Sequence, residues 1–373
     1  MRLARCVVRA VSCQIRQGVR AARSFRFVTG TLATPPLISV IRLQSGPGGQ
    51  RNLNTSPKGW ACTSISALPR IVCAGCYGLH MSDPRPIGFF DSGVGGLTVL
   101  REAQRRLPGE STIYIGDSAR HPYGTRSDAE VLDYAMELAD VLVARDVKAI
   151  VIACNTATSV ALAHLRQRHP AVPFIGVVRP GAAAAVLATR TGRIGVIATE
   201  ATVRSGAYFT AIKDQNPAVQ VEARAASALV PLIEAGDLSS AQLVEAVRST
   251  LATFKELPAA AKIDTLLLGC THFPLIRNLI AAELGESIAV VDSAAAAAAM
   301  LQEVISVNHL DAPGSTRGTA ADPGAAGHSA PARAEVLPQH QLFTTGAVEG
   351  FSGLADRLFG DRAMEAEQIS LSR

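Results

Sequence analysis

Two cysteines occupy the same place in two similar stretches of the chain. Each closes a short apolar run, in AIVIACNT over residues 149–156 and in TLLLGCTH over residues 265–272, so that Cys154 and Cys270 lie 116 positions apart. A thiol is an acid and a thiolate is a base and a nucleophile, so two cysteines suit proton transfer or covalent catalysis. A free cysteine is more often a small buried hydrophobic residue, but the matched polar residues that follow both favour a chemical role.

The apolar run before each cysteine predicts where the cysteine lies in the fold. A run of this length is typical of a buried strand, and ligands of open α/β sheets bind beyond the carboxyl ends of the strands. We therefore expect Cys154 and Cys270 at such ends, each at the N-terminus of the next helix. Backbone N–H groups and the helix dipole would lower the pKa of a thiol there.

A third strand end carries a carboxylate and a glycine-rich turn. In FFDSGVGGLT, residues 89–98, Asp91 and Ser92 precede three glycines. Thr98 stands where the dinucleotide fingerprint has its third glycine, and no lysine follows as in a P-loop, so the turn matches neither motif. We expect the glycines to let the backbone approach a small anionic ligand at a helix start, although Asp91 by itself would more simply cap that helix.

A fourth loop, YIGDSARHPYGT over residues 114–125, has more polar and turn residues than a plain connection needs. Its simplest structural explanation is a surface turn with a proline–aromatic corner. We include it as a candidate part of the same site.

The body of the chain has the pattern of an α/β protein. From residue 86 onward, short β-branched runs alternate with helical stretches rich in Ala, Leu and Arg, which is typical of βαβ units and a parallel sheet. The expected strands are 86–90, 112–115, 149–153, 174–177, 193–197, 265–268, 289–291 and 341–345. The expected helices are 97–106, 129–145, 159–168, 241–257 and 353–358, with a further capped helix start after Asp292.

Charge and cysteine content divide the chain into two parts. The whole chain of 373 residues has a formal net charge of +5, but residues 1–80 hold eleven Lys and Arg and no Asp or Glu. The rest has 25 basic and 31 acidic residues, a net charge of −6. The positive charge that would favour nucleic acid or an anionic membrane therefore belongs to the leader. No window approaches the roughly 18 apolar residues of a membrane span, so we expect a soluble protein.

Residues 1–80 admit three hypotheses. The leader resembles an organelle transit peptide in its many arginines and lack of acids, and it could also be a basic binding arm. We favour a third, that translation begins at Met81 and the leader is a misassigned or disordered segment, because it lacks sustained periodicity. Its CAGC, residues 73–76, is a lone pair of cysteines, so we expect no zinc site. The stretch 311–338, rich in Gly, Ala, Pro and Ser, is expected to be a flexible insertion.

Four motifs together carry a resemblance to a known family. FDSGVGGLT, IGDSARHPYGTRS, IACNTATS and LGCTHFPLI, in this order and spacing, resemble the glutamate racemases. The two cysteine motifs alone would indicate only the wider aspartate/glutamate racemase superfamily. The resemblance extends from about Pro86 to Leu358 and implies cofactor-independent interconversion of L- and D-glutamate, without metal or pyridoxal phosphate. It also implies a cytoplasmic enzyme that supplies D-glutamate for peptidoglycan.

The resemblance implies an architecture as well. We expect two pseudo-symmetric α/β domains with mainly parallel sheets and an active-site cleft between them. The first would combine residues 85–180 with 290–373, and the second would span 181–289. The implied partners are a small-molecule substrate, glutamate, and a second copy of the chain in a homodimer, with no membrane and no nucleic acid.

Racemisation needs two acid–base groups on opposite faces of one carbon, and a cysteine pKa of about 8.5 allows a thiol and a thiolate to exchange roles. By the resemblance, Cys154 acts on D-glutamate with the help of Asp91. Cys270 acts on L-glutamate with the help of His272 and Glu234. The implied substrate-binding residues are Asp91, Ser92, Tyr123, Gly124, Asn155, Thr156, Thr271 and His272, with Thr199 and Thr202 as further candidates whose simpler role is to cap a helix.

Three alternatives remain open on the residues alone. One is another racemase of the superfamily, such as an aspartate racemase. A second is a hydrolase with a single cysteine nucleophile. A third is a two-lobed binding protein for small ligands, which would need a secretory leader with an apolar core and gives no reason for paired thiols.

Overall fold

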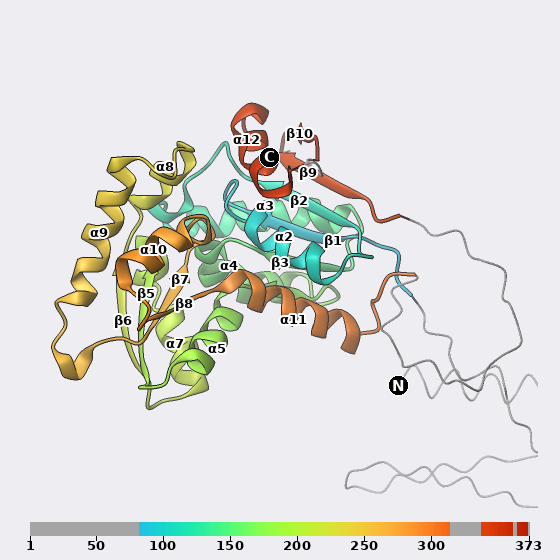
Figure 1. The fold of residues 1–373 in the computed structure, drawn as a ribbon. Coiled ribbons are helices and arrows are strands. Elements are labelled where there is room, and N and C mark those ends of the chain that lie inside the picture. The colour runs from blue at the N-terminus through green and yellow to red at the C-terminus, as the bar shows by residue number, and fades with distance from the viewer. Residues whose placement is uncertain (1–81, 314–336, 361–363, 372–373) are drawn as a thin grey trace, which may run out of the picture. The chain divides into compact units, whose positions relative to one another are not determined.

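Parallel strands alternate with helices along the described part of the chain, which comprises residues 82–313, 337–360 and 364–371 of a computed structural model (Figure 1). The leader, residues 1–80, and residues 314–336 of the expected insertion lie outside this part. The hypotheses on both segments therefore stay predictions. None of the helices in the described ranges is long and apolar enough to cross a membrane.

The first sheet has six parallel strands in the order β10-β9-β2-β1-β3-β4. Its three central strands are buried along their whole length, which explains why their sequences are almost continuously apolar. The strands are β1 (Ile87–Asp91), β2 (Thr112–Gly116), β3 (Ala149–Ile152), β4 (Phe174–Gly176), β9 (His340–Thr344) and β10 (Ala366–Gln368).

Helices cover both faces of this sheet. Neighbouring residues of a strand point to opposite sides, so an apolar strand makes both faces apolar. In β1, Phe89 belongs to the core under three helices and Phe90 to the core on the other face. Two of the three, almost 190 residues apart in the sequence, lie side by side (Figure 1). They are α2 (Leu97–Arg106) and α11 (Ser293–Val307), and the third is α12 (Val348–Phe359). The other face carries α3 (Asp128–Ala144) and α4 (Asn155–Arg168). We call this sheet with its helices the first lobe.

The second sheet has four parallel strands in the order β6-β5-β7-β8 and forms what we call the second lobe. Its strands are β5 (Arg193–Ala198), β6 (Gln220–Ala225), β7 (Thr265–Gly269) and β8 (Ala289–Asp292). One face packs on α5 (Val178–Ala188) and α7 (Ala207–Gln215). The other packs on α8 (Leu229–Glu234), α9 (Ala241–Lys255) and α10 (Arg277–Leu284).

The predicted α/β class is confirmed, and the eight expected strands lie within one residue of the observed ones at each end. The sequence did not predict β6, whose alternation is hidden by charged residues and whose side chains stay half exposed. It also missed β10 and α5, which contains Pro180 and Gly181. Proline is compatible with the first turn of a helix, where its missing N–H has no partner to lose. The proposed domain boundary at residue 290 falls inside β8.

Candidate active site

Both thiols line one cavity of about 170 Å³. Cys154 directly follows the apolar segment of β3, and Cys270 follows β7, so the cavity lies at the carboxyl ends of strands from both lobes. Both cysteines are buried. The lining residues are Ser92, His121, Pro122, Tyr123, Gly124, Thr125, Cys154, Asn155, Thr156, Thr199, Ser227, Val230, Pro231, Glu234, Cys270, Thr271 and His272.

Most of the residues predicted from the sequence meet at this cavity. The exceptions are Asp91 and Thr202, which are buried but do not line it. The sequence did not single out His121 or Ser227, which do. His121 stands in the loop that was a candidate, but its partner is far away in the sequence, so no local pattern could have revealed it.

Asp91 ends β1 and faces the glycine-rich turn. Its Oδ2 atom accepts hydrogen bonds from the N–H groups of Gly93 and Gly96, both at 3.1 Å. A Cβ atom on Gly96 would lie only 2.6 Å from that of Asp91, so the turn needs glycine there. The expectation that the glycines hold an anionic ligand is therefore corrected, because the anion that these two N–H groups bind is the protein's own carboxylate.

Cys154 is the N-cap of α4, and its Sγ accepts a hydrogen bond from the N–H of Ala157 at 3.4 Å. Burial of the thiol and the nearby negative charge of Asp91 raise the pKa of Cys154 to about 12. The prediction that the helix N-terminus lowers the pKa of this thiol is therefore wrong. The backbone N–H acts in the predicted direction, but burial and Asp91 outweigh it, so Cys154 stays a thiol.

Cys270 has a different environment. The next helix is a short 3₁₀ helix, Phe273–Ile276, whose N-cap is His272, so Cys270 lies two residues before that cap and not at the helix N-terminus as expected. Its Sγ lies 3.7 Å from Nδ1 of the buried His272. Burial acts to lower the pKa of His272, but the interactions with Cys270 and Glu234 outweigh burial and raise that pKa to about 10. His272 is therefore an imidazolium at neutral pH, a positive partner for a thiolate at Cys270.

Glu234, the last residue of α8, is shared between two histidines. Its Oε1 accepts a hydrogen bond from Nε2 of His272 at 2.8 Å, and its Oε2 lies 3.1 Å from Nε2 of His121. Burial acts to raise the pKa of Glu234, but the two histidines outweigh burial and lower it to about 2. Glu234 is therefore a carboxylate, as its predicted role beside the second thiol requires.

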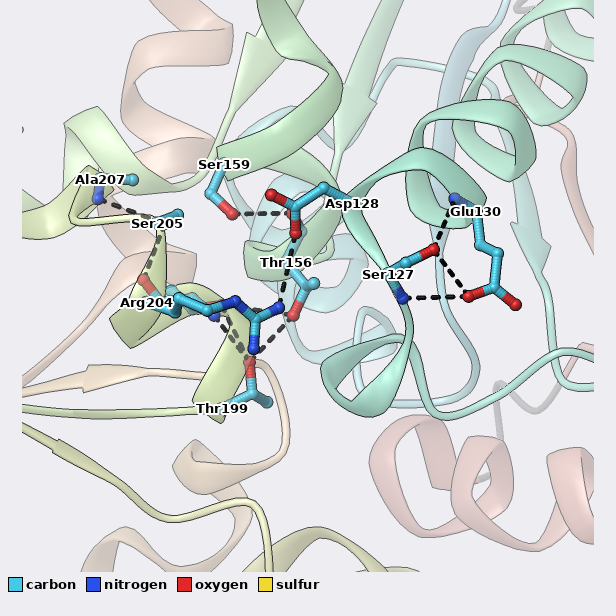
Figure 2. Close-up of polar contacts among 10 residues, drawn as sticks. Ser127, Asp128, Glu130, Thr156, Ser159, Thr199, Arg204, Ser205 and Ala207 are labelled. Atoms are coloured by element: carbon cyan, nitrogen blue, oxygen red, sulfur yellow. Dashed lines mark hydrogen bonds and ion pairs between the residues drawn. The ribbon is translucent and has the colours of Figure 1, made fainter.

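Hydroxyl groups from both lobes meet on one side of the cavity. The Oγ1 atoms of Thr156, Thr199 and Thr202 lie 2.9 to 3.2 Å from one another. Thr199 also caps α6 (Glu200–Arg204), so the expected capping role is correct even though the side chain lines the cavity. Figure 2 shows Thr156 and Thr199 together, with Arg204 of the second lobe reaching Asp128 of the first at 3.5 Å.

Asn155 and Gly124 also depend on the second lobe. The Nδ2 atom of Asn155 donates a hydrogen bond to the hydroxyl of Tyr208 at 2.6 Å, which fixes the amide beside the cavity. A Cβ atom on Gly124 would lie 2.9 Å from Cβ of Thr199, so only glycine allows this close approach. Both contacts position residues of the first lobe from the second, which explains why the sequence pattern alone does not predict them.

The two thiols of the cavity have neighbours of opposite charge, so one can act as an acid and the other as a base. One thiol lies beside a carboxylate and the other beside an imidazolium, and the remaining polar lining consists mainly of hydroxyl, amide and backbone groups. Such donors can orient carboxylates without fixed positive charge. Within the described residues, no group of three or more His, Cys, Asp or Glu is arranged to hold a metal ion.

Comparison with known proteins identifies the family. The family described as Asp/Glu/Hydantoin racemase matches residues 97–301. A glutamate racemase from Geobacter metallireducens is 42% identical over 287 residues, which are 77% of this chain and 97% of that protein.

Solved structures agree. A glutamate racemase isoform from Bacillus anthracis is 36% identical with a TM-score of 0.68, covering 77% of this chain and 98% of that one. The glutamate racemase from Francisella tularensis in complex with D-glutamate is 31% identical with a TM-score of 0.65, covering 78% and 98%. The chain belongs to the glutamate racemases of the Asp/Glu racemase family, and it is an amino-acid racemase, an isomerase.

Proposed function

We propose that this glutamate racemase moves the α-proton of its substrate with two thiols, Cys154 and Cys270, acting on opposite faces of one carbon. The observation that carries the proposal is the shared cavity, in which the two thiols have neighbours of opposite charge. A thiol that stays protonated and a thiol beside an imidazolium form the acid and the base that one turnover needs.

The reaction from L to D starts with a thiolate at Cys270. It removes the α-proton of L-glutamate, so a C–H bond breaks and an S–H bond forms. The thiol of Cys154 then delivers its proton to the other face, which gives D-glutamate and leaves a thiolate at Cys154. The reverse reaction starts from that state. The assignment of each thiol to one enantiomer follows the family resemblance.

The α-proton of an amino acid is very weakly acidic, so the transition state needs stabilisation. Hydrogen-bond donors at the cavity supply it, and the small volume of the cavity, about 170 Å³, limits the water around the developing charge. We assign the two carboxylates of the substrate to the hydroxyl, amide and backbone donors of the lining. These are Ser92, Asn155, Thr156, Thr271 and the backbone of Tyr123 and Gly124. The Francisella relative, whose structure contains D-glutamate, supports a ligand of this size.

Asp91 does not line the cavity, but its charge helps to keep Cys154 protonated, so we assign it an effect on the thiol and not on the substrate. In the cell, the enzyme would supply D-glutamate for peptidoglycan from the cytoplasm. A homodimer follows from the family resemblance, and light scattering on the purified protein tests it.

The mechanism is tested by racemisation in heavy water. Conversion of L-glutamate, followed by circular dichroism, should give D-glutamate that carries deuterium at Cα, because the delivering thiol exchanges with solvent. Product without deuterium would contradict the two-thiol mechanism. Aspartate enantiomers tested side by side provide the substrate control. Turnover of aspartate without turnover of glutamate would contradict the assignment to glutamate.

A further inference from the structure

His121 links the two lobes at the edge of the cavity. It lies in the loop between β2 and α3, and its Nε2 atom is 3.1 Å from Oε2 of Glu234 in α8 of the second lobe. The side chain of His121 is only 14% exposed. His121 and Glu234 also line a second cavity of about 310 Å³, so this pair lies between the two cavities.

The interaction with Glu234 determines which ring nitrogen of His121 carries the hydrogen. Glu234 is a carboxylate, so the Nε2 atom of His121 carries the hydrogen and donates it. Among the described residues nothing hydrogen-bonds the buried Nδ1 atom of His121. This atom packs against Gly93, where an added Cβ would lie 3.1 Å away. The ring is therefore held by Glu234 on one side and by the glycine turn on the other.

We propose that His121 is a positioning residue of the racemase reaction and that it acts through Glu234. By binding Oε2, it fixes the carboxylate so that Oε1 receives the Nε2–H of His272, which keeps Nδ1 of His272 toward Cys270. Within the described residues, no hydrogen bond joins His121 to Cys154 or Cys270. The inference rests on the proposed two-thiol mechanism and names a further residue for it.

The test uses two substitutions of His121 and one matched control. H121F keeps a ring and removes the donor, whereas H121Q keeps an N–H that can reach Glu234. His169, whose Nε2 lies 2.8 Å from Oδ1 of Asp140, is a similarly buried histidine–carboxylate pair elsewhere in the first lobe, so H169F is the control. H121N, whose amide is too short to reach Glu234, repeats the test if H121F does not fold.

We expect H121F to lower kcat by about 10- to 100-fold, with KM changed less than about threefold, because misplacement of a catalytic group affects the transition state more than substrate binding. H121Q should recover to within about fivefold of the parent, and H169F should stay within about twofold. A normal kcat in H121F, or equal losses in H121F and H121Q, would overturn the inference.

A double-mutant cycle tests the route through Glu234. If His121 acts through this carboxylate, adding H121F to Glu234→Gln should lower kcat no further, whereas additive losses would mean that His121 acts independently. The proton of His272 that binds Glu234 should also shift in the NMR spectrum of H121F and stay unchanged in H169F. Racemisation retained in Cys154→Ser or Cys270→Ser would instead refute the two-thiol mechanism, which separates the two failures.

Discussion

The two halves of the active site are alike in sequence and opposite in electrostatics. Both present a cysteine at the end of a buried parallel strand, followed by polar residues. In the first lobe the neighbour of Cys154 is the carboxylate of Asp91, and the thiol stays protonated. In the second lobe the neighbour of Cys270 is the imidazolium of His272, backed by Glu234. A repeated local pattern thus acquires two chemical roles, from Asp91 outside the first repeat and from His272 at the end of the second, which Glu234 supports.

The difference has a kinetic consequence. Because L- and D-glutamate have equal free energies in water, kcat/KM must be the same in both directions whatever the protein does. A difference between the two halves can therefore be seen only in kcat and KM taken separately. It can also be seen in the exchange of the α-proton with solvent that each thiol performs alone.

The largest effect is expected when either thiol is removed. Cys154→Ser and Cys270→Ser should each lose racemisation by about 1,000-fold or more, since one acid–base group is missing. Cys154→Ser should still exchange the α-proton of L-glutamate with heavy water, as measured by proton NMR. Cys270→Ser should exchange that of D-glutamate more slowly, because only a small fraction of Cys154 is a thiolate. Exchange of the same enantiomer by both variants would contradict the assignment of opposite faces.

Loss of the imidazolium should come next. His272→Gln should lower kcat by about 100-fold, because the positive partner of Cys270 is removed. The fall should be larger in the L to D direction, with KM compensating so that kcat/KM stays equal in both. Steady-state kinetics on each enantiomer measures this, and equal falls of kcat in the two directions would mean that His272 does not distinguish the halves.

Glu234→Gln should change stability and its pH dependence. At pH 7 we expect a loss of about 1–2 kcal/mol in the free energy of unfolding, because a hydrogen-bonded carboxylate becomes neutral. His272 has a pKa of about 10 in the folded protein and 6.5 as its ordinary value, so its stabilising proton is held below pH 6.5 and lost as the pH rises toward 10. Urea unfolding should therefore show that the free energy of unfolding falls less from pH 7 to 9 in the variant than in the parent.

The contribution of Glu234 to stability changes with pH in the opposite direction to that of His272. Glu234 has a pKa of about 2 against an ordinary 4.5, so its contribution is present above pH 4.5 and lost as the pH falls toward 2. At pH 3 the difference in the free energy of unfolding between parent and variant should be smaller than at pH 7. A gap that stays constant from pH 3 to 9 would show that this pair does not stabilise the fold through its charges.

The smallest effect is expected at Tyr208, whose hydroxyl fixes Asn155 and lies 2.8 Å from Oγ of Ser293. Tyr208→Phe should raise KM by about threefold and leave kcat within about twofold, because one hydrogen bond to a binding residue is lost. A fall of kcat comparable to that in His272→Gln would instead place Asn155 in the proton-transfer step.

The sequence was sufficient for the parts of the site that local patterns encode. Cys154 and Cys270 were predicted because each closes an apolar strand, and the parallel sheets were predicted from the same runs. The pKa of Cys154 was predicted in the wrong direction, because its burial and the nearby charge of Asp91 depend on β1 lying beside β3 in the sheet. His121 was missed since its partner, Glu234, belongs to the other lobe.

The central claim, that burial and the charge of Asp91 keep Cys154 a thiol, is tested most directly by titrating thiolate absorbance in Cys270→Ser and in the double variant Cys154→Ser/Cys270→Ser. The cysteines outside the site are common to both variants and cancel in the difference. The account predicts that the two variants show the same amount of thiolate from pH 7 to 9.5, because burial and Asp91 raise the pKa of Cys154 to about 12. A thiolate that forms in Cys270→Ser within this range and is absent from the double variant would contradict it.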